Sequence, residues 1–332
     1  PAPEKKNRGT VGLPLALGMY ELLPLWHGIF KELGFTVKVS PMSSRDTYFK
    51  GQQSIPSDTA CYPAKLMHGH MESLIEKGAK LIFYPSMSYN LDEGHGKNHY
   101  NCPVVAYYPK VLGANVHFPR DVKYVSGFVG LHNRRAFRLF VRMMRENGIA
   151  LDPKAVERAA DLAYAEYISY MKRVHDEGQR YLAVARERGL PVVVLAGRPY
   201  HIDPEINHGI PRLICDLGAV VVSEDALASD VPFFETTVLN QWTYHARLYA
   251  AAKRVAEERE QPMGLVQLVS FGCGVDAITT DEVRAILESA GQLYTQIKID
   301  EITNLGAVKI RLRSLFAVMS ERDKRGARRT RV

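Results

Sequence analysis

The sequence predicts an α/β protein of two lobes with parallel sheets, joined by a helical connector. Apolar runs typical of β-strands alternate along the chain with segments whose apolar residues have helical spacing. The order strand, loop, helix, glycine, strand occurs near the start and again after residue 190, with Gly34 and Gly218 at the matching place. Parallel strands need helical crossovers, and this alternation supplies them.

The first lobe is expected over residues 10–130. Its strands are predicted at 10–15, 35–40, 79–84 and 104–108, and its helices at 20–33 and 63–77. A polar loop of about 18 residues precedes the strand at 104–108, and loops of that length inside compact domains usually serve a function.

Residues 131–188 are expected to form the helical connector, as two long helices interrupted near 148–153. The second lobe is expected over 189–319. Its strands are predicted at 191–197, 219–225, 265–271 and 294–299, and its helices at 207–217, 280–290 and 305–318. Thr279 and Glu282 have the spacing of a capping box at the start of the second of these helices.

The charge lies mainly in the two ends of the chain. The net charge is +7, but residues 1–8 carry +2 and residues 320–332 carry +4, which leaves about +1 for the body. We therefore expect a flexible N-terminal tail over 1–9 and a basic disordered tail over 320–332. A nucleic-acid binder carries its basic patch on the folded body, so this class is disfavoured.

Several protein classes are disfavoured by composition and motifs. No run of about 18 apolar residues is present, so no transmembrane helix is expected. The polar start without an initiator Met is what a processed chain or a piece of a longer one would show. Four widely spaced cysteines indicate reduced thiols in a cytoplasmic protein. No GxGxxG, P-loop, GxSxG or HExxH motif occurs, which argues against common nucleotide or hydrolase chemistry.

Three of the cysteines lie at junctions between loops and regular elements. Cys61 comes two residues before Pro63 and thus at a helix N-terminus, where free N–H groups and the helix dipole favour a thiolate. Cys102 ends the long polar loop before a predicted strand. Cys273 follows a strand and is flanked by Gly272 and Gly274, which allow close backbone approach and free N–H groups for an anionic centre. The plainer alternative for Cys61 and Cys102 is a small buried side chain.

The fourth cysteine differs from these three. Cys215 lies among apolar residues of a predicted helix and is expected to be a buried core thiol. The other three thiols come from both lobes and would meet only in a cleft. Soft thiolates bind iron–sulfur clusters, zinc or copper(I), and three ligands would leave one iron of a cluster open. A zinc site formed by cysteine with His95 and His99 of the long loop is the alternative.

Five segments of the chain form a specific pattern, namely IPSDTACYPAKLMHGH, YNCPVV, LAGRPYHIDPEINHGI, SFGCGVDAITTDEV and KIDEITNLGAVKIRLRSL. With these segments the sequence resembles the 2-hydroxyacyl-CoA dehydratase-related family over residues 10–318, and most closely the domain found in acyl-CoA dehydratase activase-related proteins. Relatives include cluster-bearing dehydratase subunits and double-cubane cluster proteins.

The resemblance implies two flavodoxin- or Rossmann-like lobes and an iron–sulfur cluster, [4Fe–4S] or double-cubane in type, on Cys61, Cys102 and Cys273. It implies an ATP-dependent activase of the sugar-kinase/Hsp70 class (ASKHA) as a separate domain or protein that supplies one low-potential electron. Dehydration would also need a second dehydratase-like subunit or a homodimer.

Three functions are compatible with these features. The leading hypothesis is low-potential electron transfer or reductive chemistry at an open-site cluster, by a dehydratase-like lyase or an ATP-dependent reductase component. The alternatives are a non-catalytic scaffold that docks the activase and relays electrons, and a zinc-stabilised α/β binding module.

Overall fold

The structure is a computed structural model that describes residues 7–131, 135–270 and 272–329. It divides into two compact units. Unit 1 comprises residues up to Asp92 together with His99–Tyr170 and Asp203–Glu205. Unit 2 comprises Glu93–Asn98, Met171–Ile202 and the chain from Ile206 onward. The predicted N-terminal tail lies largely outside the described residues, since the first six are not among them.

Unit 1 is built on a four-stranded sheet in the order β2-β1-β3-β4, with every pair parallel. Its strands are β1 (Thr10–Leu13), β2 (Thr36–Val39), β3 (Leu81–Phe83) and β4 (Lys123–Val125). Its helices are α1 (Gly18–Glu32), α2 (Arg45–Gly51), the 3-10 turn η1 (Gln52–Ser54), α3 (Tyr62–Glu76), α4 (Pro103–Asn115) and α5 (Arg135–Glu146).

Unit 2 repeats this topology with a parallel sheet in the order β6-β5-β7-β8. Its strands are β5 (Val192–Ala196), β6 (Val220–Ser223), β7 (Met263–Val269) and β8 (Thr295–Lys298). Its longer helices are α8 (Ile210–Asp216), α9 (Thr243–Glu257), α10 (Gly274–Ser289) and α11 (Leu305–Arg329). Its short 3-10 turns are η2 (Pro199–Ile202), η3 (Glu224–Ala226) and η4 (Ala228–Asp230).

Two helices are divided between the units. The unit boundary falls between Tyr170 and Met171, inside the long helix α6 (Pro153–Glu187), and the short helix α7 (Pro204–Asn207) is also split. Within unit 1, the Tyr167 hydroxyl on α6 donates to Glu21 at 2.7 Å. Within unit 2, Gln179 on α6 donates to the Ala226 carbonyl at 2.8 Å. The predicted connector is therefore two helices, α5 and α6, and the second is a structural part of both units.

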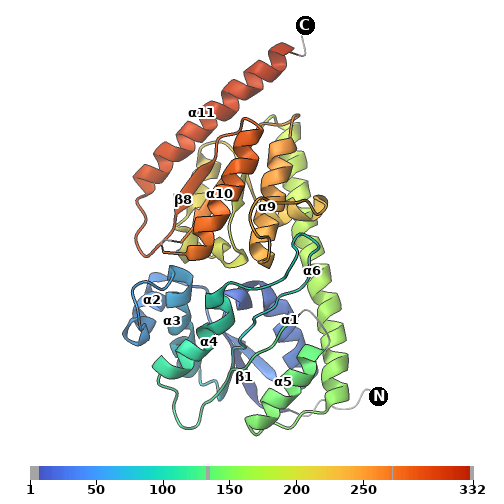
Figure 1. The fold of residues 1–332 in the computed structure, drawn as a ribbon. Helices are drawn as coiled ribbons and strands as arrows, with labels where there is room; N and C mark the ends of the chain where they lie inside the picture. The colour runs from blue at the N-terminus through green and yellow to red at the C-terminus, as the bar shows by residue number, and fades with distance from the viewer. Residues whose placement is uncertain (1–6, 132–134, 271, 330–332) are drawn as a thin grey trace. The chain divides into compact units, whose positions relative to one another are not determined.

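The predicted fold class is confirmed by the two matching parallel sheets. Every residue of β3, β5 and β7 is buried, as expected for parallel strands covered on both faces, and Figure 1 shows helices on both sides of each sheet. Gly34 and Gly218 end equivalent helices with φ of 88° and 89°, a left-handed conformation that favours glycine. Within the described residues, no helix combines the length and apolar character needed to cross a membrane.

One predicted strand is wrong in a way that matters for function. Residues 104–108 belong to helix α4, which begins at Pro103, and the fourth strand of unit 1 is Lys123–Val125. The β-branched pair after Pro103 suggested a strand. A proline at the first helical position, preceded by an N-cap that accepts a backbone hydrogen bond, favours the helix instead.

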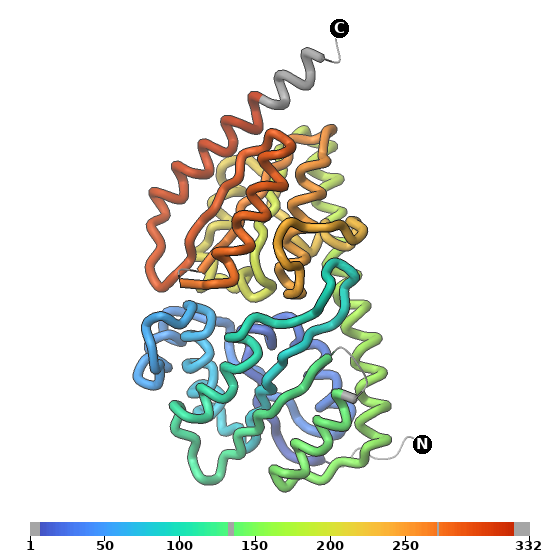
Figure 2. Tube along the Cα trace, in the orientation of Figure 1, coloured from blue at the N-terminus to red at the C-terminus, as the bar shows by residue number. Residues whose placement is uncertain are grey.

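Three further predictions are corrected. Helix α10 begins at Gly274, so Thr279 and Glu282 lie inside it and form no capping box; Glu282 accepts from the Thr237 amide at 3.1 Å. Cys215 is exposed rather than buried, because its neighbour Ile214 faces the core and successive helical residues point about 100° apart. Helix α11 continues to Arg329, so the described part of the predicted disordered tail is helical. Figure 2 follows the chain from β8 into this helix.

Candidate functional site

Each of the three candidate cysteines is the N-cap residue of a helix. Cys61 precedes α3, Cys102 precedes α4 and Cys273 precedes α10, and these helices have 15, 13 and 16 residues. The first N–H groups of a helix have no partner within it, and together with the helix dipole they favour negative charge. All three cysteines thus lie at the positive end of a helix, although the sequence indicated a helix N-terminus only for Cys61.

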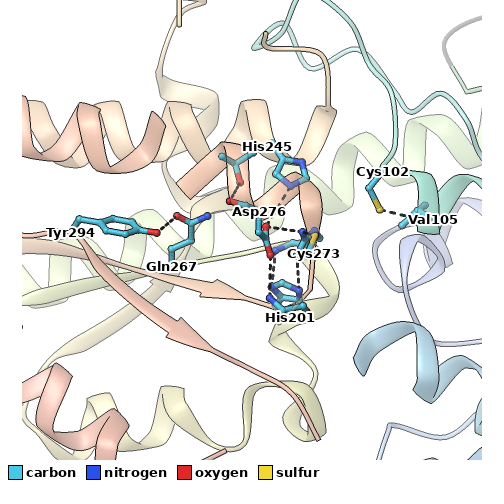
Figure 3. A network of polar contacts seen from close by, with 11 residues as sticks. Cys102, Val105, His201, His245, Gln267, Cys273, Asp276 and Tyr294 are labelled. Carbon is cyan, nitrogen blue, oxygen red and sulfur yellow. Dashed lines mark hydrogen bonds and ion pairs between the residues drawn. The ribbon is translucent and has the colours of Figure 1, made fainter. Parts of the chain in front are cut away.

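Cys61 and Cys102 have nearly the same local geometry in unit 1. Their φ and ψ angles are −62° and 148° for Cys61 and −61° and 155° for Cys102. Each is followed by a proline in the first turn of its helix. The Cys102 sulfur accepts a hydrogen bond from the Val105 amide at 3.4 Å (Figure 3). Two helices of unit 1 therefore begin with the same cysteine–proline arrangement.

Tyr84 follows β3 and lies in the electrostatic field of both sulfurs. Burial raises the pKa of Tyr84 well above its usual range, and Tyr124, Tyr108, Cys102 and Cys61 raise it further. The Tyr84 side chain is 0% exposed, and its hydroxyl has no hydrogen-bond partner among the described residues. A buried O–H group of unit 1 thus lies within the electrostatic influence of both cysteines.

Cys273 lies in a glycine turn at the end of β7 in unit 2. Gly272 has φ of +72°, the left-handed region that favours glycine. A Cβ atom added at Gly274 would meet nothing within 4 Å. The turn borders a pocket of about 340 Å³ whose lining includes Ser270, Gly272, Cys273, Gly274, Asp276 and Lys298. The conformational need for glycine is therefore at Gly272, whereas Gly274 leaves open space beside the sulfur.

A buried polar network of unit 2 reaches the Cys273 sulfur. Arg198, which follows β5, donates from Nη2 to Cys273 Sγ at 3.0 Å and to Asp276 Oδ1 at 2.7 Å. Its Nη1 lies 3.2 Å from His201 Nε2. The other Asp276 oxygen accepts from the Ser270 amide at 3.1 Å, and His245 Nε2 lies 3.8 Å from Asp276 Oδ1. Figure 3 shows Asp276 between the two histidines.

This network contains one charged pair and two neutral imidazoles. Burial alone would raise the pKa of Asp276, but Arg198 and then His245 and His201 outweigh it and hold that pKa below its usual range. Burial, followed by the positive charge of Arg198, lowers the pKa of His201. Burial likewise lowers the pKa of His245 against the opposing effect of Asp276. Near neutral pH the network therefore holds Arg198 as a cation and Asp276 as an anion.

Arg198, His201, His245 and Asp276 were not among the residues singled out from the sequence. Arg198 follows Gly197, the first residue after β5, and Asp276 is three residues beyond Cys273. In open parallel sheets, side chains that follow neighbouring strands meet at the carboxyl edge, but the sequence carries no local signal that β5 pairs with β7.

The described residues contain no group of three or more His, Cys, Asp or Glu side chains placed to hold a metal ion. Unit 1 supplies Cys61 and Cys102, and unit 2 supplies Cys273 and the exposed Cys215. A set of three thiolates therefore needs ligands from both units. The donor chemistry fits an iron–sulfur cluster, because each candidate is a thiol at a helix N-terminus and one lies between glycines with open space beside it.

Both histidines of α3 contact hydroxyl groups in the interior of unit 1. His68 and His70 are fully buried. The ring nitrogens of His68 contact the Ser54 and Tyr108 hydroxyls at 2.7 and 2.9 Å. Those of His70 contact the Ser40 and Ser43 hydroxyls at 2.7 and 3.0 Å. In the loop, His99 lies 3.4 Å from Asp92 in unit 1, whereas His95 belongs to unit 2.

These histidines predict that acid destabilises the protein. Burial lowers the pKa of His70 to about 3 and that of His68 to about 4. Below about pH 6.5 the unfolded chain binds protons that the folded chain does not bind. The free energy of unfolding should therefore fall as pH drops from 6 to 4, by about 1 kcal/mol per pH unit for His70. Urea unfolding across this range measures it, and His70→Gln should flatten the slope; an equal slope in both proteins would contradict the assignment.

The open space at Gly274 makes a substitution there a clean probe of the turn. Gly274→Ala should leave the free energy of unfolding of the apo protein within about 1 kcal/mol of wild type, because the added Cβ meets nothing. If the turn holds an iron–sulfur cluster, the same Cβ should crowd its sulfides and lower iron occupancy or the reduction potential. Iron per chain and a redox titration after anaerobic reconstitution measure this, and equal values in the two proteins would remove the turn from the site.

The fold and the three N-cap thiols together define a two-unit parallel α/β protein with cysteine-bearing helix N-termini. The family model "CoA enzyme activase uncharacterised domain (DUF2229)" matches residues 10–227, and the chain belongs to this family. The match includes Cys61, Cys102 and Arg198, and ends before Cys273.

Other comparisons add no function. A search of curated proteins finds no match. Among solved structures, a GTP-binding protein from Sulfolobus solfataricus in complex with GDP is 8% identical, with 94% of this chain and 99% of that chain covered and a TM-score of 0.27. The C-terminal domain of glucosamine-fructose-6-phosphate aminotransferase from Francisella tularensis is 10% identical, with 96% and 85% covered and a TM-score of 0.23. Similarities this weak indicate neither the fold nor the function of this protein.

Proposed function

We propose that the protein binds an iron–sulfur cluster through Cys61, Cys102 and Cys273 and carries out low-potential electron transfer or reductive chemistry with it. The observation that carries the proposal is that these three cysteines, and not Cys215, are N-cap residues of helices. Helix N-termini stabilise the thiolate form that an iron ligand requires. When bound, the cluster supplies a centre that takes up and passes on single electrons.

The residues around the sulfurs have defined parts in this proposal. The glycines beside Cys273 let the backbone approach the cluster. Three cysteine ligands would leave one iron of a [4Fe–4S] cubane open to an outside ligand, or to the sulfide that bridges two cubanes in a double-cubane cluster.

The family membership supports an activase-related system. We propose that an ATP-dependent activase of the sugar-kinase/Hsp70 class is the electron donor, and that the protein is related to 2-hydroxyacyl-CoA dehydratases. It would then act as a dehydratase-like lyase or as a component of an ATP-dependent reductase. Dehydration would further require a second dehydratase-like subunit or a second copy of this chain.

The test is ATP-dependent reduction. Anaerobically reconstituted protein is mixed with an activase, a reductant and ATP, and the EPR spectrum is recorded against a sample with a non-hydrolysable ATP analogue. A reduced-cluster signal that appears only with hydrolysable ATP is the expected result. A signal independent of ATP and activase would contradict the proposed coupling. Turnover of 2-hydroxyacyl-CoA in the same mixture would indicate a catalyst, and its absence an electron-relaying scaffold. A protein that binds zinc in place of iron would support the alternative of a zinc-stabilised α/β binding module.

A further inference from the structure

We propose that Arg198 is a positioning residue that holds a fixed positive charge against the Cys273 sulfur. Nothing in the family description or in the sequence motifs assigns it this part. The contact belongs to unit 2 alone and exists in the protein without any bound group. Its consequence for a cluster rests on the proposed function, whereas its effect on the thiol does not.

The guanidinium is held by its neighbours in one orientation. Arg198 is 4% exposed, and its Nη2 contacts both Asp276 and Cys273, while Nη1 lies against His201. Asp276, also 4% exposed, is fixed in turn by the Ser270 amide. A planar fork with contacts on both terminal nitrogens cannot rotate away without breaking several of them. The donor that faces Cys273 is therefore preorganised.

The network presents a charged donor to the sulfur. Nη2 of Arg198 is shared between Cys273 Sγ, at 3.0 Å, and Asp276 Oδ1, at 2.7 Å, and both histidines are neutral because burial lowers their pKa values. Arg198 is thus a cation in direct contact with Sγ, held in place by the carboxylate. A hydrogen bond from a charged donor is about twice as strong as a neutral one, and it strengthens as the acceptor becomes more negative.

This arrangement has a consequence for redox chemistry. An electron added to a cluster increases the negative charge on its sulfurs, including the ligand sulfur. A fixed cation at Cys273 stabilises that reduced form more than the oxidised form. Loss of Arg198 should therefore lower the reduction potential of a bound cluster, in addition to any loss of iron.

The charge can be tested in the apo protein with two alkylating reagents. The same thiolate displaces iodide from neutral iodoacetamide and from anionic iodoacetate, so the ratio of the two rates cancels the fraction of Cys273 that is ionised. A cation beside the sulfur favours the anionic reagent. Mass spectrometry of the Cys273 peptide gives both rates. In Arg198→Gln the iodoacetate-to-iodoacetamide ratio should fall about tenfold, which is the scale of one charge-assisted hydrogen bond.

A matched control separates this effect from damage to the fold. Arg247 is another buried arginine of unit 2, 3% exposed, and it is paired with Glu93 and Asp225 instead of a cysteine. Arg247→Gln should leave the ratio at Cys273 unchanged, and Arg198→Lys should restore part of it. If Arg198→Gln does not fold, the wild-type protein still tests the proposal. Its iodoacetate-to-iodoacetamide ratio at Cys273 should exceed the ratio measured for the neutral free thiol N-acetylcysteinamide. A wild-type ratio equal to that of the free thiol, or unchanged in folded Arg198→Gln, would overturn the proposal.

Iron analysis keeps this inference distinct from the proposed function. If wild-type protein takes up no iron but its alkylation ratio depends on Arg198, the cluster proposal fails and the role of Arg198 stands. If iron binds but neither the ratio nor the reduction potential changes in Arg198→Gln, the role of Arg198 fails and the cluster proposal stands.

Discussion

Alanine at position 69 is expected to unfold unit 1. Gly69 lies in the middle of α3, and a Cβ atom there would be 1.7 Å from the Thr47 carbonyl oxygen of α2. A Cβ atom on Gly51 of α2 would likewise be 2.2 Å from the Gly69 amide. These neighbours are backbone atoms, so no side-chain rotation relieves the overlap. The two helices would have to separate, at a cost of more than about 4 kcal/mol.

The consequence reaches the candidate site because α3 begins directly after Cys61. Urea unfolding of the apo protein measures the loss. Gly113→Ala is the matched control, since this helical glycine of α4 meets only the Tyr124 ring, at 3.3 Å, and should change the free energy of unfolding by about 1 kcal/mol or less. A Gly69→Ala protein as stable as Gly113→Ala would contradict the close approach of α2 and α3.

Serine in place of Cys61, Cys102 or Cys273 is expected to lower iron binding at least about tenfold, since each change removes a ligand and loss of even an outer-shell partner costs that much. Serine can still act as an N-cap residue, so the apo proteins should remain folded. Cys215→Ser is the control, because that thiol is exposed on α8 and caps no helix. The assignment would be contradicted if none of the three serine variants lost iron, or if only Cys215→Ser lost it.

The repeated fold was predictable because strand and helix periods depend on local sequence. A buried strand such as Val192–Ala196 is recognisable as a short apolar run, and a left-handed helix end such as Gly34 as a glycine after a helical pattern. Residues 104–108 misled the prediction because a β-branched run carries the same local signal in a buried helix and in a strand, and only the N-cap contact at Cys102 distinguishes them.

The cysteines were predictable as candidates because turn-forming residues surround them. The network behind Cys273 was not, since the ion pair between Arg198 and Asp276 joins residues 78 positions apart. Its geometry depends on the pairing of β5 with β7, which no local pattern encodes. The position of the buried Tyr84 hydroxyl could not be predicted for the same reason, because Cys61 and Cys102 come near it only through the packing of unit 1.

Whether the three N-cap thiols hold an iron–sulfur cluster is tested most directly by the Mössbauer spectrum of anaerobically reconstituted ⁵⁷Fe protein, with iron and sulfide counted per chain. We expect equal amounts of iron and sulfide and a cubane-type spectrum with one iron site distinct from the rest, because three cysteines leave one iron of the cubane without a thiolate. A protein that binds zinc instead, or iron without sulfide, would contradict this expectation.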